Sequence, residues 1–172
     1  EAGCVILRVS SRLLDMQPAP LPAFIDASRI CLRKHRVELA EAMFAYIERE
    51  RERLARFLPW PPLITCVDDE VAYIEGINAQ WGEGSLFDFG IFRKEDDVYM
   101  GNLGVHSINW PHDGCELGYW ILGDFEGQGY MNEAVGALEL ALFELGFHRI
   151  EIRCESTNHR SVQLPRRRGY QL

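Results

Sequence analysis

The sequence predicts a single mixed α/β domain of the α+β type, and not a regular repeat of strand, helix and strand. Three segments of alternating hydrophobicity follow one another between residues 87 and 121, as is typical of strands joined as antiparallel neighbours. Segments with helical periodicity lie before and after this block. A chain of 172 residues is long enough to build one independent hydrophobic core.

The part of the chain before the strand block predicts one strand and two helices. Residues 28–32 alternate weakly and predict the first strand, and an apolar period over residues 37–57 predicts the first helix. Prolines within residues 58–62 end that helix, because proline has no backbone N–H and restricts the residue before it. A second helix is predicted over residues 65–84, since it begins with a sequence resembling a capping box and ends with glycines.

The remaining elements follow from the same two periodicities. The strand block comprises residues 87–91, 99–105 and 115–121, with a polar turn over 94–97. After it come a helix over residues 131–145, a strand over 150–154 and a last helix over 161–168 that Gly169 closes. The predicted order is therefore strand, two helices, three strands, helix, strand and helix.

Composition and charge exclude several classes of protein. A formal net charge of −8 argues against binding along a nucleic-acid backbone, which needs clustered Lys and Arg. The five cysteines are scattered and odd in number, so we expect reduced thiols in a cytoplasmic protein and no disulfide framework. No apolar run approaches the length of a membrane span, and His106 and His112 lack the spacing of metal ligands. We therefore expect no metal site and no membrane partner.

Residues 1–25 are predicted to form a flexible extension, with the domain spanning residues 26–172. The first residues are mildly apolar and basic, but they lack the hydrophobic stretch and cleavage site of a secretion signal. The sequence QPAPLPAF follows, and its three prolines in five residues are typical of a linker. The role of this extension stays open.

The segment Glu116–Val135, ELGYWILGDFEGQGYMNEAV, carries the strongest functional signal. A strand runs into a turn that contains Gly127 and Gly129, and a helix follows at once. Small residues at such a turn leave backbone N–H groups free at the positive end of the helix dipole, where a phosphate group can bind. No Walker lysine follows the glycines, and the spacing of the dinucleotide-binding G-x-G-x-x-G motif is absent.

This segment resembles the acetyl-CoA loop of the GNAT acetyltransferases, whose signature is Gln/Arg-x-x-Gly-x-Gly/Ala. The matching residues are Glu126-Gly127-Gln128-Gly129-Tyr130-Met131, in which Glu126 replaces the usual Gln or Arg and Met131 the small residue. The flanking sequences ELGYW, YMNEAVGAL and HRIEIRCESTNHRS are similar to the RimJ/RimL branch, which acetylates protein N-termini. The resemblance extends from about Asp26 to the last residue.

The resemblance implies the GNAT fold, a mixed and mostly antiparallel central sheet with helices on both faces. It also implies two more strands after the last helix, whereas the given sequence ends at Gln171-Leu172. Truncation, residues missing from the sequence, or strands supplied by a partner are three explanations that stay open. Arg168 stands where the family usually has an apolar residue, and Pro165 interrupts the last helix, so the packing of this helix is in question.

The resemblance also implies a set of residues that bind acetyl-CoA. In the family the strand before the loop pairs through its backbone with the pantetheine arm, and the loop binds the pyrophosphate. The corresponding residues are Trp120, Ile121 and Leu122 on the strand, Gly127, Gln128, Gly129, Tyr130 and Met131 in the loop, and Asn158 and Ser161 after the fifth strand. Asn158 and Ser161 match the family's Asn-x-x-Ser, although both are also good helix N-caps.

Two residues are candidates for catalysis and one more for binding the acceptor. Glu116 is the candidate base, and the alternative is a strand carboxylate that is exposed or held in a salt bridge. Ser161 would protonate the departing CoA thiolate. Trp60, in the proline-rich turn, would line the acceptor pocket together with Glu116. No cysteine has the neighbours of a covalent acyl carrier, which favours direct transfer.

We therefore predict an N-acetyltransferase that moves an acetyl group from acetyl-CoA to a primary amine, with the α-amine of a protein N-terminus as the first choice. One alternative acceptor is a small amine such as an antibiotic, a polyamine or an amino acid. Another alternative is an acyl-CoA-binding module without catalytic activity. The expected partners are acetyl-CoA and the amine acceptor, and a homodimer stays open.

Overall fold

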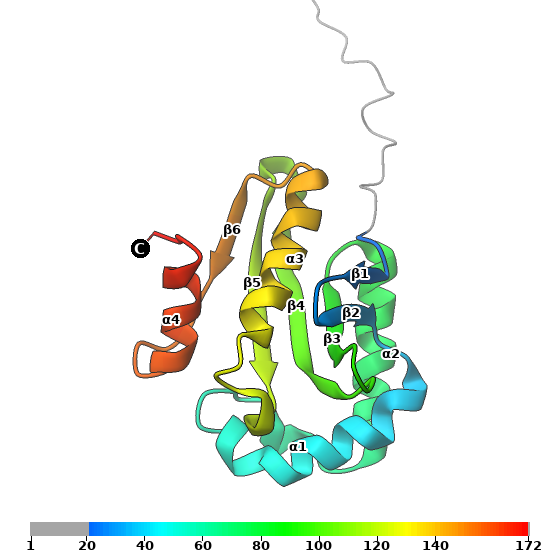
Figure 1. Ribbon diagram of the computed structural model, residues 1–172. Helices are drawn as coiled ribbons and strands as arrows, with labels where there is room; N and C mark the ends of the chain where they lie inside the picture. The colour runs from blue at the N-terminus through cyan, green and yellow to red at the C-terminus, as the bar shows by residue number, and fades with distance from the viewer. Residues whose placement is uncertain (1–20, 172) are drawn as a thin grey trace, which may run out of the picture.

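The computed structural model describes residues 21–171, and the residues before Leu21, which make up most of the predicted extension, lie outside this range. A single six-stranded sheet forms the centre, with the strands arranged side by side in chain order (Figure 1). The strands are β1 Phe24–Asp26, β2 Ile30–Lys34, β3 Phe87–Arg93, β4 Tyr99–Asn109, β5 Gly114–Ile121 and β6 Arg149–Ile152. All neighbours are antiparallel except β5 and β6, which are parallel.

Four α-helices surround the sheet. They are α1 Ala40–Leu54, α2 Val67–Glu83, α3 Tyr130–Glu144 and α4 His159–Arg167, and short 3-10 turns lie at Val37–Leu39, Pro61–Leu63, Trp110–His112 and Gly123–Phe125. Ile30 and Leu32 of β2 pack in one buried cluster with α3, while Cys31 between them packs in a second cluster with α1 and α2. Helices therefore cover both faces of a mostly antiparallel sheet, which confirms the predicted fold class.

The first hairpin differs from the prediction of one strand over residues 28–32. The N–H of Ala27 donates to the carbonyl of Ile30, so residues 28 and 29 lie in a turn and the strand begins two residues later. An additional strand, β1, pairs antiparallel with β2. Leu21, only 2% exposed, is also part of the core. The packed structure thus includes residues that the proline-rich composition assigned to the extension.

The centre of the sheet is more deeply buried than alternation predicted. All residues from Phe87 to Phe92 of β3 are buried, including Asp88, because helices cover both faces. β4 continues to Asn109, four residues beyond the predicted end. The N-cap of α2 is Cys66 and not Thr65, since the carboxylate of Asp69, the third residue of the helix, accepts from the backbone N–H of Cys66 over 3.1 Å as in a capping box.

β5 has a partner on both edges only over its first half. It pairs with β4 along its whole length, but it pairs with β6 only from Gly114 to Leu117. Beyond Leu117 the two parallel strands separate, and within the described chain no strand pairs with this edge of β5. The gap leaves backbone groups available for another molecule.

The last helix is attached to α3 through Arg168, where the family resemblance led us to expect an apolar residue. The guanidinium of Arg168 forms an ion pair with Glu139 of α3 and donates to the carbonyl of Asn132 over 3.1 Å. The hydroxyl of Tyr170 donates to the same carboxylate over 2.7 Å. Gly136 faces the guanidinium and leaves room for it. A satisfied polar cluster thus replaces apolar packing at this junction.

We expect Arg168→Ala to lower the free energy of unfolding by about 3 kcal/mol, because it leaves the buried carboxylate of Glu139 without its cation. Urea unfolding followed by circular dichroism measures this loss. Combining Arg168→Ala with Glu139→Gln removes the uncompensated charge and should recover part of the stability. A loss below about 0.5 kcal/mol would show that the pair does not hold α4 in place.

Candidate active site

The loop between β5 and α3 forms a ring of free backbone N–H groups at a helix N-terminus. Gly127 and Gly129 have φ angles of 74° and 83°, in the left-handed region that glycine adopts without strain. The backbone N–H groups of residues 127–132 donate to no atom of the described chain. They lie where the helix dipole is positive, so the loop is built to bind an anion.

The side chains of the loop hold its shape. Gln128 donates to the carbonyl of Asp124 over 2.7 Å, while Arg29 donates to the carbonyl of Gln128 over 3.1 Å and pairs with Glu133. Tyr130 and Met131 are only 9% and 8% exposed, with their side chains in the core. Only the backbone groups of these two residues are therefore available to a ligand at the loop.

Glu126, the unexpected acid of the loop, is neutralised by two arginines. Its carboxylate pairs with Arg53 from α1 over 2.7 Å and with Arg160 from the first turn of α4. Arg53 also pairs with Glu50, whose carboxylate accepts from the N–H of Gly123. The carboxylate of Glu126 is therefore balanced, and its pairs link the loop to α1 and α4.

The second half of β5 presents alternate residues to the gap. The N–H of Leu122 donates to the carbonyl of Met100 on β4, whereas the carbonyl of Ile121 points away from β4 and accepts from Arg53 over 2.8 Å. Backbone groups alternate between the two edges of a strand, so Tyr119 and Ile121 face the gap, and Trp120 and Leu122 face β4. Of the three predicted pantetheine partners, Ile121 thus faces the open edge. The side chain of Leu122 is fully buried.

Asn158 and Ser161 lie on the other side of the gap. The side-chain carbonyl of Asn158 accepts from the N–H of Ser161 over 3.2 Å, so Asn158 is the N-cap of α4 and the capping alternative holds for it. The hydroxyl of Tyr119 donates to the carbonyl of Ser161 over 3.2 Å. This contact joins β5 to the beginning of α4 and places Ser161 beside the open edge.

Glu116 lies outside the cavity described below. Its side chain is 15% exposed, and its carboxylate is 3.4 Å from the guanidinium of Arg153. In the sheet register Glu116 pairs with His106 on β4. Glu116 is therefore held in a salt bridge, as the alternative interpretation of this residue predicted. It lies two residues before Gly118, near the point where β5 and β6 separate.

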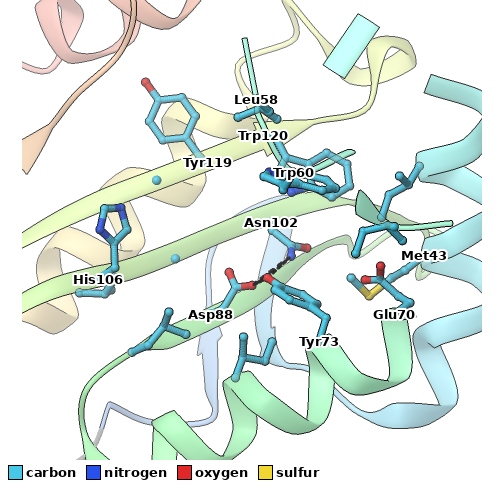
Figure 2. Close-up of a pocket in the computed structure, with 17 residues that line it drawn as sticks. Met43, Leu58, Trp60, Glu70, Tyr73, Asp88, Asn102, His106, Tyr119 and Trp120 are labelled. Carbon is cyan, nitrogen blue, oxygen red and sulfur yellow. Dashed lines mark hydrogen bonds between the residues drawn. The ribbon is translucent and has the colours of Figure 1, made fainter. Parts of the chain in front are cut away.

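A cavity of about 340 Å³ lies between the sheet and helices α1 and α2 (Figure 2). Trp60 and Trp120 form part of its wall, with ring centroids 5.7 Å apart. Trp81 and Trp110, two further tryptophans, pack instead in the core against Phe87. Gly104 and Gly118 are neighbours across β4 and β5 and both line the cavity, where the lack of side chains hollows the sheet surface.

The floor of this cavity carries polar groups that the sequence did not reveal. Tyr73 and Asn102 both donate to one carboxylate oxygen of Asp88, Asn102 over 3.1 Å (Figure 2). Burial raises the pKa of Asp88, and burial lowers the pKa of His35, whose imidazole lies 3.6 Å from it. The floor therefore holds a carboxyl group with neutral hydrogen-bond donors around it.

Glu70, on the first turn of α2, is the second acid of the floor. It is 1% exposed, and its Oε1 atom has no hydrogen-bond partner among residues 21–171. Burial, and after it the charge of Asp88, raises the pKa of Glu70 to about 7. One feature of the sequence could have pointed to this floor but was not used, namely Asp88 within the apolar segment FDFGIF. Nothing in the sequence distinguished Glu70 from the other acids of its helix turn.

A sheet edge that opens beside a helix N-terminus with free amides, next to a cavity with apolar walls, is the arrangement that an acyltransferase of the acyl-CoA-dependent class needs. The family model described as an acetyltransferase (GNAT) domain matches residues 29–171. The chain therefore belongs to the GNAT acetyltransferase family.

Individual relatives agree with this family. The ribosomal-protein-serine acetyltransferase of Escherichia coli (strain K12) is 28% identical over 131 residues, which cover 76% of this chain and 72% of that protein. The structure of RimL, a ribosomal L7/L12 alpha-N-protein acetyltransferase in complex with coenzyme A, superimposes with a TM-score of 0.82 at 24% identity, covering 87% of this chain and 84% of that one. The microcin C7 self-immunity acetyltransferase MccE, in complex with acetyl-CoA and AMP, gives a TM-score of 0.80 at 21% identity, over 84% and 80% of the two chains.

The sequence led us to expect neither a metal site nor a membrane partner. Within residues 21–171 no three or more His, Cys, Asp or Glu side chains are grouped so that they could hold a metal ion. None of the helices there is both long enough and apolar enough to cross a membrane. Cys31, Cys66, Cys115 and Cys154 are all free thiols.

We expect Glu126→Gln to bind acetyl-CoA about fivefold more tightly at low ionic strength, because Arg160 loses its acidic partner and Arg53 keeps only Glu50, which leaves positive charge beside the loop. Calorimetric titration measures the change, which should shrink as salt is added. Glu155→Gln, at an exposed position, is the control. Weaker binding by Glu126→Gln would mean that the ion pairs act mainly by holding the loop in shape.

We expect Glu70 to make the protein less stable as the pH rises. The pKa of Glu70 is about 7 in the folded protein against 4.5 as the ordinary value, so the folded state binds the proton more tightly than the unfolded state. This contribution to stability is complete below about pH 4.5 and is lost as the pH rises to about 7. Glu70→Gln should be more stable than wild type by about 3 kcal/mol near pH 8, and the difference should be small near pH 5. Urea unfolding at the two pH values measures this. An equal difference at both would contradict the raised pKa.

Proposed function

We propose that this protein transfers the acetyl group of acetyl-CoA to the α-amine of a protein N-terminus. One observation carries the proposal: Gly118, Tyr119 and Trp120 line the cavity and belong to the half of β5 that β6 leaves unpaired, beside the anion-binding loop. A thioester along that edge would meet an amine held in the cavity. The names of the E. coli relative and of RimL favour a protein N-terminus as the acceptor.

The backbone of Gly127, Gln128, Gly129, Tyr130 and Met131 would bind the pyrophosphate. Their N–H groups are free, and a side chain at Gly127 or Gly129 would be strained by the positive φ, so both observations fit a phosphate cradle. The pantetheine arm would add to the edge of β5, where Tyr119 and Ile121 turn their backbone groups to the gap. An N–H of this edge would stabilise the oxyanion, since it needs no reorganisation during the reaction.

The amine nitrogen attacks the thioester carbonyl, the C–S bond breaks, and one amine proton must leave. Glu116 would accept that proton, directly or through water, and Ser161, beside Tyr119, would protonate the CoA thiolate and regain its proton from solvent. Asn158 would hold the beginning of α4, and Trp60 would contact the acceptor. An α-amine has a pKa near 8, so about a tenth of it is neutral at pH 7 and a weak base suffices.

A small amine is the second candidate acceptor, because the cavity is lined on most sides by apolar side chains and aromatic rings. A binder without activity is the third alternative. Calorimetric titration with acetyl-CoA, followed in the same sample by thiol release against N-terminal peptides and small amines, separates the three. Binding with release on peptides supports the proposal, and release on small amines alone contradicts it. Binding without release on either supports the binder.

We expect Ser161→Ala and Glu116→Gln each to lower kcat by about 10- to 100-fold, while the affinity for acetyl-CoA changes less than about threefold. A proton-transfer role appears in kcat, whereas loss of a structural contact would also weaken acetyl-CoA binding. Thiol-release kinetics and calorimetry measure the two quantities. Ser156→Ala, at an exposed site before α4, is the matched control for Ser161→Ala. Unchanged kcat in either variant would remove that residue from the mechanism.

A further inference from the structure

Two buried acids on the cavity floor have no lysine or arginine partner. Glu70 is 1% exposed and Asp88 is 7% exposed, yet no Lys or Arg within residues 21–171 forms an ion pair with either. The imidazole of His35 lies 3.6 Å from Asp88, and burial favours its neutral form, while His106 is a second imidazole that lines the same cavity. Buried acids in proteins are normally paired with a cation or a metal ion, so this floor lacks a group that its chemistry calls for.

The arrangement of the two acids points into the cavity. The hydrogen bonds of Tyr73 and Asn102 satisfy one oxygen of Asp88, while Oε1 of Glu70 is buried without a partner and the residue lines the cavity. Figure 2 shows Glu70 on the helix side of the hollow and Asp88 on its sheet side. A ligand group between them would therefore meet carboxyl oxygens from two directions.

A hollow path connects this floor to the edge of β5. Gly118 pairs with Gly104, and Gly104 pairs with Asp88, so these three positions form a row across β5, β4 and β3. Neighbouring strands are about 4.8 Å apart, which puts Asp88 roughly 10 Å from the β5 backbone. The two glycines add no side chain to this row, and the imidazole of His106 lies against Gly118 at its β5 end.

We propose that Glu70 and Asp88 form a subsite for a second, positively charged group of the acceptor, about two strand spacings from β5. The inference rests on the proposed function, which places the reacting amine at the edge of β5. In a protein N-terminus, this group is the side chain of a lysine or arginine among the first residues. A serine hydroxyl stays next to its own α-amine and does not reach the floor, whereas a long basic side chain does, with its methylene groups against the apolar walls.

The test compares two peptides that differ only at the first residue, lysine in one and its uncharged analogue norleucine in the other. With wild type we expect kcat/KM for acetylation of the α-amine to be at least about tenfold higher for the lysine peptide. Glu70→Gln should reduce this preference to below about threefold and leave the norleucine peptide nearly unaffected. Glu75→Gln, an exposed position on the same helix, is the control. Mass spectrometry of the product identifies which amine is acetylated.

Each alternative result has a distinct meaning. Equal kcat/KM for the two peptides in wild type overturns the subsite while the proposed function stands. An equal loss for both peptides in Glu70→Gln also overturns it, because Glu70 would then act in the transfer itself. Turnover of the linear diamine cadaverine that depends on Glu70 supports the subsite and moves the acceptor to a small amine. If no amine is acetylated, calorimetry of the two peptides with the CoA-bound protein still decides, and tighter binding of lysine by wild type alone supports the subsite.

Discussion

The divergence of β5 from β6 is the constraint on which the rest of the site depends. A strand inside a sheet has all its backbone groups paired, and it offers nothing to a ligand. β5 is paired with β6 only as far as Leu117, so its second half keeps one edge open while β4 holds the other edge rigid. The strand then leads directly into the loop and α3. An open strand edge and a helix N-terminus, both suited to polar ligands, are therefore adjacent without any additional element.

Contacts across the gap explain how an acid can stand in an anion-binding loop. Glu126 bridges Arg53 of α1 and Arg160 of α4, and Arg53 also reaches the carbonyl of Ile121. On the same side, Tyr119 reaches the carbonyl of Ser161. Helix α1, helix α4 and the segment from β5 to the loop are thus connected beside the open edge, although neither helix pairs with the sheet. The charge that looks unfavourable in the sequence is part of what positions the arginines.

The sequence predicted most elements and the loop, but it could not predict the cavity floor. Periodicity is a local property, so it located the helices and the strand before Gly127 to within a few residues. The β1–β2 hairpin was not predicted, because the nearby prolines and the two-residue turn interrupt the alternation of its short strands. Asp88 and Glu70 are 18 residues apart in sequence, on a strand and a helix, and they meet only through the sheet register and the packing of α2. The neighbours of Glu116 likewise depend on that register, through β4 and β6.

The two buried acids Glu139 and Glu70 show how differently one chain treats the same chemical group. Glu139 is 8% exposed and has Arg168 and Tyr170 as partners, with Gly136 leaving the space for the guanidinium. Glu70 is more deeply buried, and its surroundings raise its pKa where a basic partner would lower it. The fold is therefore able to pair a buried acid when only stability is involved. An unpaired carboxyl group that lines a cavity is better explained by what enters the cavity, since a ligand cation would remove the cost of burial when it binds.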